Sequence, residues 1–142
     1  MHQAERLCAS RGLRFTELRK RVLELVCKYT QPVGAYTLLD DLRDEGRSAA
    51  PPTIYRALDF LQQQGLVHRL ASNNTYLACA HPQTEHEGFF LVCSTCGYTQ
   101  EVHTQDIVEA VKSCAGEFEF AVDRVSVEVT GLCRNCKDSD RG

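Results

Sequence analysis

Two Cys-x-x-Cys pairs constrain the fold of this chain more than any other feature: Cys93 with Cys96, and Cys133 with Cys136. In this spacing one tight turn brings both sulfurs to a single point, and Gly97 permits such a reversal directly after the first pair. Four thiolates leave no open coordination position, which is typical of a structural zinc. Zinc sites of this kind contribute on the order of 10–16 kcal/mol in small modules.

Two disulfides, a thioredoxin-like redox pair and an iron–sulfur site are the alternatives for the same cysteines. The N-terminus has no apolar stretch typical of a signal peptide, and no apolar run approaches the roughly 18 residues that span a membrane. We therefore expect a cytoplasmic chain, in which disulfides are disfavoured. The second pair lies near the C-terminus rather than opening a helix after a strand, which disfavours the redox pair.

The charge is distributed unevenly between two halves of the 142 residues. Residues 1–78 carry eleven Lys and Arg against eight Asp and Glu, a net +3, whereas residues 79–142 carry five against eleven, a net −6. Six of the eight cysteines lie from Cys79 onward. This asymmetry indicates two modules with different roles, although the small basic excess is weak support for nucleic-acid binding.

The first 65 residues predict four helices and no strand. Apolar residues recur at three- and four-residue spacing within 3–10, 17–31, 34–46 and 50–65. Thr16 is the expected N-terminal cap of the second helix. The fourth helix is expected to start at Pro51-Pro52, and Thr53 is an alternative N-terminal cap for it. Residues 66–70 and 75–79 then predict a β-hairpin around a Ser-Asn-Asn turn. A hairpin after two such helices makes a winged helix-turn-helix.

Several polar side chains of this module are candidates for contacts with DNA. Tyr55 and Arg56 fall off the apolar stripe near the start of the fourth helix, the part that enters a major groove, and Arg can pair bidentately with guanine. A solvated helix face is the rival interpretation. The candidate DNA contacts are Tyr36, Thr53, Tyr55, Arg56, Arg19 and Lys20.

The second half predicts a small α+β domain. A predicted hairpin over 88–92 and 98–102 surrounds the first cysteine turn. A helix is expected to begin at Thr104 or Asp106, and its inward residues are Ile107, Val108, Val111 and Cys114. Alternating apolar residues then predict a strand over Phe118–Val129. A domain of this size has little apolar core of its own, so we expect a stabilising cross-link and a second subunit. The expected boundaries are 1–79 for the winged helix, 80–85 for a hinge and 86–142 for the dimerisation domain.

Four further residues are candidates for a second metal site. His68 and Cys79 lie on the two wing strands and flank the turn, His86 begins the next domain, and Glu101 follows the first cysteine turn on the paired strand. Two imidazoles, a thiolate and a carboxylate could therefore meet around zinc. Spacing alone does not require this, because His68 could lie near phosphate, Cys79 could be a buried apolar residue and Glu101 a solvated one. His81 is a rival ligand, and His81 or His103 could contribute to a third site.

The ordered motifs resemble the Fur family of metal-dependent repressors and, within it, the zinc uptake regulator (Zur) type. They read Pro-Pro-Thr-Ile-Tyr-Arg-Ala-Leu-Asp-Phe-Leu, Gly-Leu-Val-His, Tyr-Leu-Ala-Cys, Cys-x-x-Cys-Gly and a terminal Cys-x-x-Cys, and they cover nearly the whole chain. The resemblance implies a winged helix, a hinge and a dimerisation domain with a four-cysteine zinc. It assigns structural zinc to Cys93, Cys96, Cys133 and Cys136, regulatory zinc to His68, Cys79, His86 and Glu101, and DNA contacts to Tyr55, Arg56 and Tyr36.

Two departures from the iron-type and peroxide-sensing relatives argue against iron and peroxide sensing. Those proteins carry a run of histidines before the first cysteine pair and a histidine before the third helix. Here the first region reads His81-Pro-Gln-Thr-Glu-His86, and the second reads Pro32-Val33-Gly34.

The expected function is a repressor that binds operator DNA as a homodimer, with two zinc ions per subunit, when zinc closes the hinge and silences zinc-uptake genes. The alternatives are a regulator of another metal, a zinc-dependent enzyme and a structural zinc-ribbon module. An enzyme needs an open metal position with a nearby acid or base, and the sequence offers no such set, so we expect no catalysis.

Overall fold

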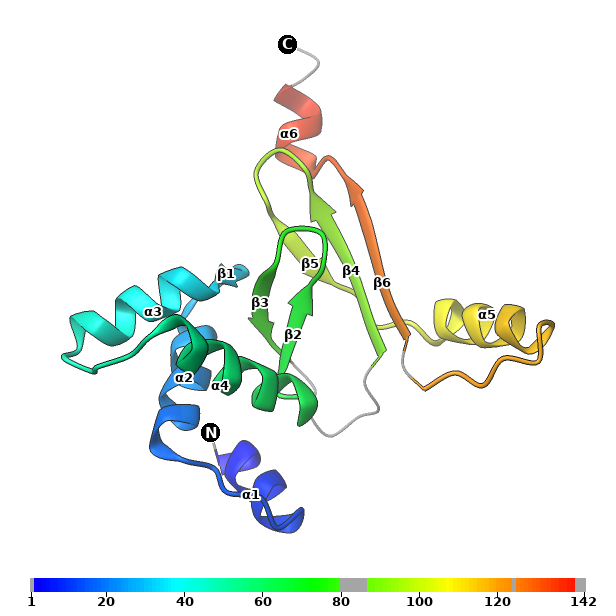
Figure 1. Ribbon diagram of the computed structural model, residues 1–142. Helices are drawn as coiled ribbons and strands as arrows, with labels where there is room; N and C mark the ends of the chain where they lie inside the picture. Colours follow the sequence, from blue (N-terminus) through cyan, green and yellow to red (C-terminus); the bar gives the residue numbers. More distant parts are fainter. Residues whose placement is uncertain (1, 80–86, 124, 140–142) are drawn as a thin grey trace. The chain divides into compact units, whose positions relative to one another are not determined.

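The computed structural model describes residues 2–79, 87–123 and 125–139 (Figure 1). The chain divides into two compact units, Met1–Thr84 and Glu85–Gly142. Both units mix helices with a small sheet, as the predicted α+β class requires. Within the described ranges, no helix is long and apolar enough to cross a membrane.

Four helices build the first unit around an apolar core. They are α1 (His2–Ser10), α2 (Glu17–Lys28), α3 (Ala35–Asp44) and α4 (Pro51–Gln63). Their inward residues follow the three- and four-residue spacing of an amphipathic helix, and Leu25, Leu38, Leu42, Leu58 and Leu61 are each at most 1% exposed. Because these leucines come from α2, α3 and α4, their burial fixes how the helix-turn-helix pair packs on α2.

The helix ends follow the predicted signals with one correction. Thr16 caps α2, since its Oγ1 accepts a hydrogen bond from the backbone N–H of Arg19 at 3.3 Å. The cap of α4 is Ala50, and Pro51 occupies the first helical position. Thr53 therefore lies within the first turn and is not the cap, because proline's missing N–H and fixed φ already suit the start of a helix.

A three-stranded antiparallel sheet completes the first unit in the order β1-β3-β2. β2 (Val67–Leu70) and β3 (Thr75–Ala78) form the predicted wing hairpin. No strand was predicted at β1 (Val33–Gly34), which pairs with Thr75 and Tyr76 of β3. A two-residue strand has no periodicity of its own, so only its partner defines it. The first unit is thus a winged helix-turn-helix.

The second unit contains β4 (Glu87–Cys93), β5 (Thr99–Glu101), α5 (Gln105–Gly116), β6 (Val125–Gly131) and α6 (Arg134–Ser139). The predicted hairpin is present as β4 and β5, which pair antiparallel. β6 pairs with the other edge of β4 in the parallel direction, so that Cys93 lies opposite Gly131. This register brings the ends of β4 and β6 together, where the two cysteine pairs follow.

Two expectations for this unit are wrong, and one helix was not predicted. The strand predicted over Phe118–Val129 begins only at Val125, because the backbone N–H groups of Phe118 and Phe120 both donate to Ala115 O at 3.0 Å and continue the winding of α5. Cys114 is exposed rather than inward. The helix α6 was not expected at all, since six residues show too little periodicity.

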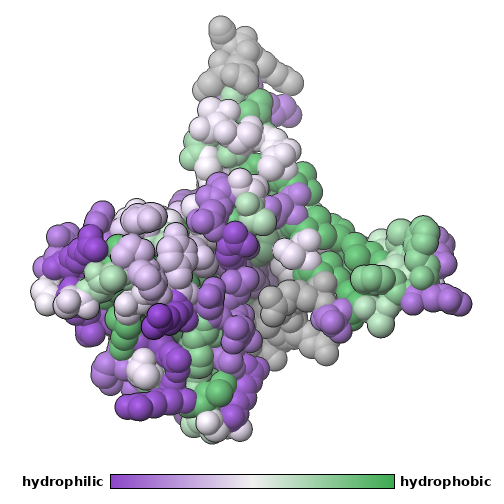
Figure 2. Space-filling model, viewed as in Figure 1, coloured by the Kyte–Doolittle hydropathy of each residue, from purple (hydrophilic) through white to green (hydrophobic). Residues whose placement is uncertain are grey.

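Apolar surface remains uncovered on the second unit. Figure 1 shows α5 to one side of the sheet instead of across it, and Figure 2 shows apolar side chains along the strands and on α5. Leu91 and Val129 are neighbours in register and 42% and 45% exposed. Phe118 and Phe120 beyond α5 are 78% and 68% exposed. Such a surface is typical of an interaction site.

Candidate metal centres and nucleic-acid interface

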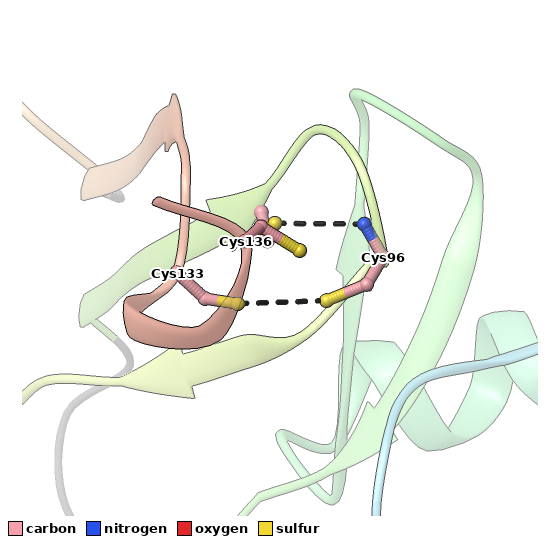
Figure 3. Close-up of side chains that lie close together, drawn as sticks. Cys96, Cys133 and Cys136 are labelled. Atoms are coloured by element: carbon pink, nitrogen blue, oxygen red, sulfur yellow. Dashed lines mark hydrogen bonds between the residues drawn. The ribbon is translucent and has the colours of Figure 1, made fainter. Parts of the chain in front are cut away.

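The four cysteines of the two pairs meet at the end of the sheet in the second unit. Their sulfur atoms all lie within 4.8 Å of one another. Cys93 ends β4 and Cys96 follows in the turn. Cys133 directly precedes α6, and Cys136 lies in its first turn (Figure 3). The backbone N–H of Ser94 donates to Gly131 O at 2.8 Å, which ties the two halves of the cluster together.

Local backbone geometry explains why the first pair converges. The N–H of Gly97 donates to Cys93 O at 2.9 Å, and the N–H of Cys93 donates to Tyr98 O at 2.8 Å, which closes a tight turn. Gly97 has a φ of +80°, a conformation that side chains with a Cβ rarely adopt. This conformation fits the predicted role of Gly97, which is to permit the tight turn directly after the first cysteine pair.

The spacing of the sulfurs fits a tetrahedral zinc. The Sγ atoms of Cys96 and Cys133 lie 3.7 Å apart (Figure 3). A zinc–sulfur bond of about 2.3 Å places the corners of a tetrahedron about 3.8 Å apart, whereas a disulfide needs about 2.05 Å. The geometry therefore fits shared coordination of one ion, and it does not fit a disulfide between these two cysteines.

The pKa values of the thiols in the cluster are shifted in opposite directions. Backbone N–H groups, first that of Cys96, lower the pKa of Cys93 to about 6. The neighbouring Cys133 thiol raises the pKa of Cys136 to about 12. For Cys96, the Tyr98 amide lowers the pKa, but the thiols of Cys93 and Cys133 and burial raise it, and the pKa is raised on balance. Ionisation of all four thiols thus requires a positive charge among them, which a divalent cation supplies.

Two of the other predicted metal ligands share the wing. The N–H of Cys79 donates to Leu66 O at 2.9 Å and extends the β2–β3 ladder by one pair, and His68 lies opposite Leu77. His68 and Cys79 are therefore diagonal neighbours on the same face of the hairpin. Both are half-buried, and a ligand atom of each lies within 4.8 Å of the other. The wing thus presents a nitrogen and a sulfur donor side by side.

The second unit contributes Glu101, the last residue of β5. The Glu101 carboxylate lies 3.4 Å from Nε2 of His103, and its side chain is only 13% exposed. The sequence analysis considered His103 only for a third metal site and missed this contact, although two-residue spacing on a strand is a signal for it. His86 and His81 lie outside the described residues.

The predicted DNA contacts differ in how available they are. Tyr36, the second residue of α3, is 64% exposed, and Arg56 on α4 is exposed, while Thr53 and Tyr55 are half-buried. The Arg19 guanidinium lies 3.8 Å from the centre of the Phe60 ring and also donates to Arg14 O. The Lys20 ammonium lies 3.2 Å from a Glu5 carboxylate oxygen and 3.7 Å from one of Glu17. Tyr36 and Arg56 are thus the more available side chains.

Comparison with known proteins places the chain in one family of regulators. The model of the ferric uptake regulator family matches residues 10–130, and the chain belongs to this family. The family consists of regulators, so the prediction that the chain is not an enzyme is confirmed.

Within that family the chain is similar to zinc uptake regulators. It is 38% identical over 135 residues to the zinc uptake regulation protein of Escherichia coli K12, covering 94% of this chain and 79% of that protein. A solved structure of a zinc uptake regulator complexed with zinc and DNA is 37% identical, has a TM-score of 0.90, and covers 99% of this chain and 95% of its own. A holo XcZur crystal structure is 41% identical, with a TM-score of 0.85 and 96% coverage of both chains.

Proposed function

We propose that this chain is a zinc-responsive transcriptional repressor that acts in the cytoplasm, binds operator DNA as a homodimer and silences genes for zinc uptake. The observation that carries the proposal is the similarity of almost the whole chain to a zinc uptake regulator in complex with zinc and DNA. The chain is 38% identical to the zinc regulator of Escherichia coli but only 27% identical to the ferric uptake regulation protein of Vibrio cholerae, which supports zinc rather than iron as the sensed metal.

The four-cysteine cluster holds a structural zinc in this proposal. Its ligands are Cys93, Cys96, Cys133 and Cys136, whose sulfurs have the spacing of a tetrahedral site. The ion neutralises crowded thiolates and joins the end of β4 to α6. Because the second unit is small and leaves much apolar surface exposed, we expect this zinc to be required for its folding.

A second, regulatory zinc per subunit takes His68 and Cys79 from the wing, with His86 and Glu101 from the other side of a hinge at 80–85. The proximity of the His68 and Cys79 donor atoms supports the wing half of this site. One thiolate and one carboxylate give a ligand charge of −2, which balances the ion. With the domain boundaries 1–79 and 86–142, a zinc held by both domains restricts their relative orientation.

Zinc then controls DNA binding by shifting a population of domain orientations. Without the second ion, the two DNA-binding domains of a dimer sample many orientations, and with it they keep a spacing that fits successive major-groove faces. Since binding free energies are linked, operator DNA tightens zinc binding by the same factor by which zinc tightens DNA binding.

The α4 helix reads the operator in this proposal. Arg56 is exposed near its start, where it can pair with guanine, and Tyr55 lies beside it. Tyr36, which is 64% exposed, contacts the DNA backbone from the start of α3. Thr53, Arg19 and Lys20 complete the proposed contacts, although the last two must first exchange their partners within the chain.

The homodimer forms through the second unit. A groove of about 410 Å³ runs over the sheet and is lined by Leu91, Tyr98, Val129 and Leu132, among others. These four side chains are each 42–45% exposed, and Phe118 beyond α5 is 78% exposed. A second copy offers matching apolar surface for both regions, and burying them would stabilise the pair by about 25 cal/mol per Å² of apolar area.

A metal titration with operator DNA tests the proposed function. The DNA is first selected from a random pool by the zinc-loaded protein, and its affinity is then measured while zinc, iron or manganese is added to protein that retains only the structural ion. We expect zinc to raise the affinity. An affinity that no metal changes contradicts a sensing role and favours a structural zinc module, and a response to iron or manganese alone favours a regulator of that metal.

A further inference from the structure

The end of β5 places a histidine against one of the proposed zinc ligands. Nε2 of His103 lies 3.4 Å from Oε1 of Glu101, two residues away in the second unit. The Glu101 side chain is 13% exposed, whereas that of His103 is 46% exposed. The histidine is thus the more exposed member of the pair, and it is not a member of the four-cysteine cluster.

The strand backbone accounts for this contact. The N–H of Val102 donates to Phe89 O at 2.8 Å, so the ladder between β4 and β5 continues one residue beyond Glu101. Thr104 is also extended, with φ −148° and ψ 129°. Side chains two residues apart on an extended strand point to the same face, which brings the imidazole to the carboxylate.

A carboxylate in this position needs a donor besides a metal. Glu101 has lost most of its contact with water, and a buried carboxylate is costly unless its oxygens are paired. The neighbouring Gln100 amide donates to the backbone carbonyl of Glu101 rather than to its carboxylate, at 3.0 Å. Since a carboxylate has about four acceptor sites on its two oxygens, it can bind an ion and a histidine together.

We infer that His103 is a positioning residue for the regulatory zinc site, in which its imidazole orients the Glu101 carboxylate towards the ion without binding the ion itself. This inference rests on the proposed function, because it takes Glu101 as a zinc ligand. Partners of this kind fix the orientation of ligating carboxylates, and their loss costs about 10–100-fold in metal affinity. A surface pair of His and Glu with no such role contributes little.

Three variants of the full-length chain test the inference through metal affinity. Zinc affinity of the second site is measured by competition with a chromophoric chelator, in protein that keeps its structural ion. We expect His103→Ala to lower this affinity by about 10–100-fold. His103→Gln places an amide N–H close to the position of Nε2, so we expect it to recover most of the loss.

His2→Ala is the matched control. His2 also contacts a glutamate, with Nδ1 3.6 Å from Oε2 of Glu5, but it lies in α1 and is 94% exposed. We expect its removal to leave zinc affinity unchanged. A cobalt-substituted second site gives a further readout, because its visible spectrum reports the ligand set: His103→Gln should keep the wild-type spectrum, as a positioning residue requires.

A double-mutant cycle completes the test. If His103 acts through Glu101, then His103→Ala has no additional effect in a Glu101→Ala chain. Wild-type affinity in His103→Ala overturns the inference, and so does a His103→Gln chain that is as weak as His103→Ala, because the histidine would then be a ligand itself. A wild-type chain that binds one zinc only contradicts the proposed function as well, so the two failures are distinguishable.

Discussion

Proton competition at the four-cysteine cluster predicts a steep pH dependence of zinc affinity. Each thiol that must lose a proton to bind zinc raises the affinity tenfold per pH unit. Cys96 and Cys136 have raised pKa values, that of Cys136 about 12, so both are protonated in the metal-free chain near neutral pH. Two displaced protons give an increase of at least about 100-fold per pH unit around pH 7–8.

Cys93 changes the steepness at lower pH. Its pKa is lowered to about 6, so above that pH it is already a thiolate and protons no longer compete for it. Below about pH 6 it contributes a further factor of ten per unit. The affinity therefore rises with pH throughout, and the slope is steeper on the acid side of the Cys93 pKa.

The assay is a zinc competition with a chelator at several pH values, in a Cys79→Ser background that leaves only the four-cysteine site. Cys27→Ser is the control, because Cys27 is an exposed thiol on α2 outside the cluster and its loss should not change the slope. Cys136→Ser should reduce the slope by one. A slope below two in the Cys79→Ser chain would refute the opposite pKa shifts of the cluster thiols and the reasoning built on them.

Three further changes have defined outcomes. Arg56→Ala should cost about 1–3 kcal/mol of operator affinity and relax base preference at one position, measured by fluorescence anisotropy with operator variants; a uniform loss on all sequences would indicate a phosphate contact instead. Val129→Asp should dissociate the dimer in sedimentation, since Val129 is 45% exposed on the apolar sheet face, while Leu13→Asp, at a 37% exposed leucine of the first unit, should not. Thr16→Ala should lower the free energy of unfolding of the first unit by about 0.5–2 kcal/mol, measured by urea denaturation, because the Arg19 amide loses its hydrogen-bond acceptor at 3.3 Å. An unchanged urea midpoint would show that the cap does not stabilise the unit.

Much of the fold was predictable because local signals and burial agree. The apolar spacing of α2, α3 and α4 matches the leucines that are at most 1% exposed, and the Cys-x-x-Cys spacing implied the convergence of four sulfurs. The helix cap at Thr16 and the wing hairpin also follow from nearby residues alone.

Three of the misses depend on contacts that the residue pattern does not show. Phe118 and Phe120 alternate with polar residues as a strand would, yet residues 118–123 have no neighbouring strand among the described residues, and the end of α5 takes their N–H groups. Lys20 was predicted to contact DNA, but its ammonium group forms an ion pair with Glu5 of α1. The His103 contact depends on how far the β4–β5 ladder extends.

The central claim is that a second zinc, bound in part by the wing, switches operator binding. The most direct test measures the operator affinity of the wild-type chain and of Cys79→Ser, each with and without added zinc, after confirming that both are dimers with the structural ion. The wild type should gain about 5–150-fold in affinity from zinc, the range of ordinary allosteric coupling, and Cys79→Ser should gain nothing. A Cys79→Ser dimer whose DNA binding responds to zinc as the wild type does would contradict the account.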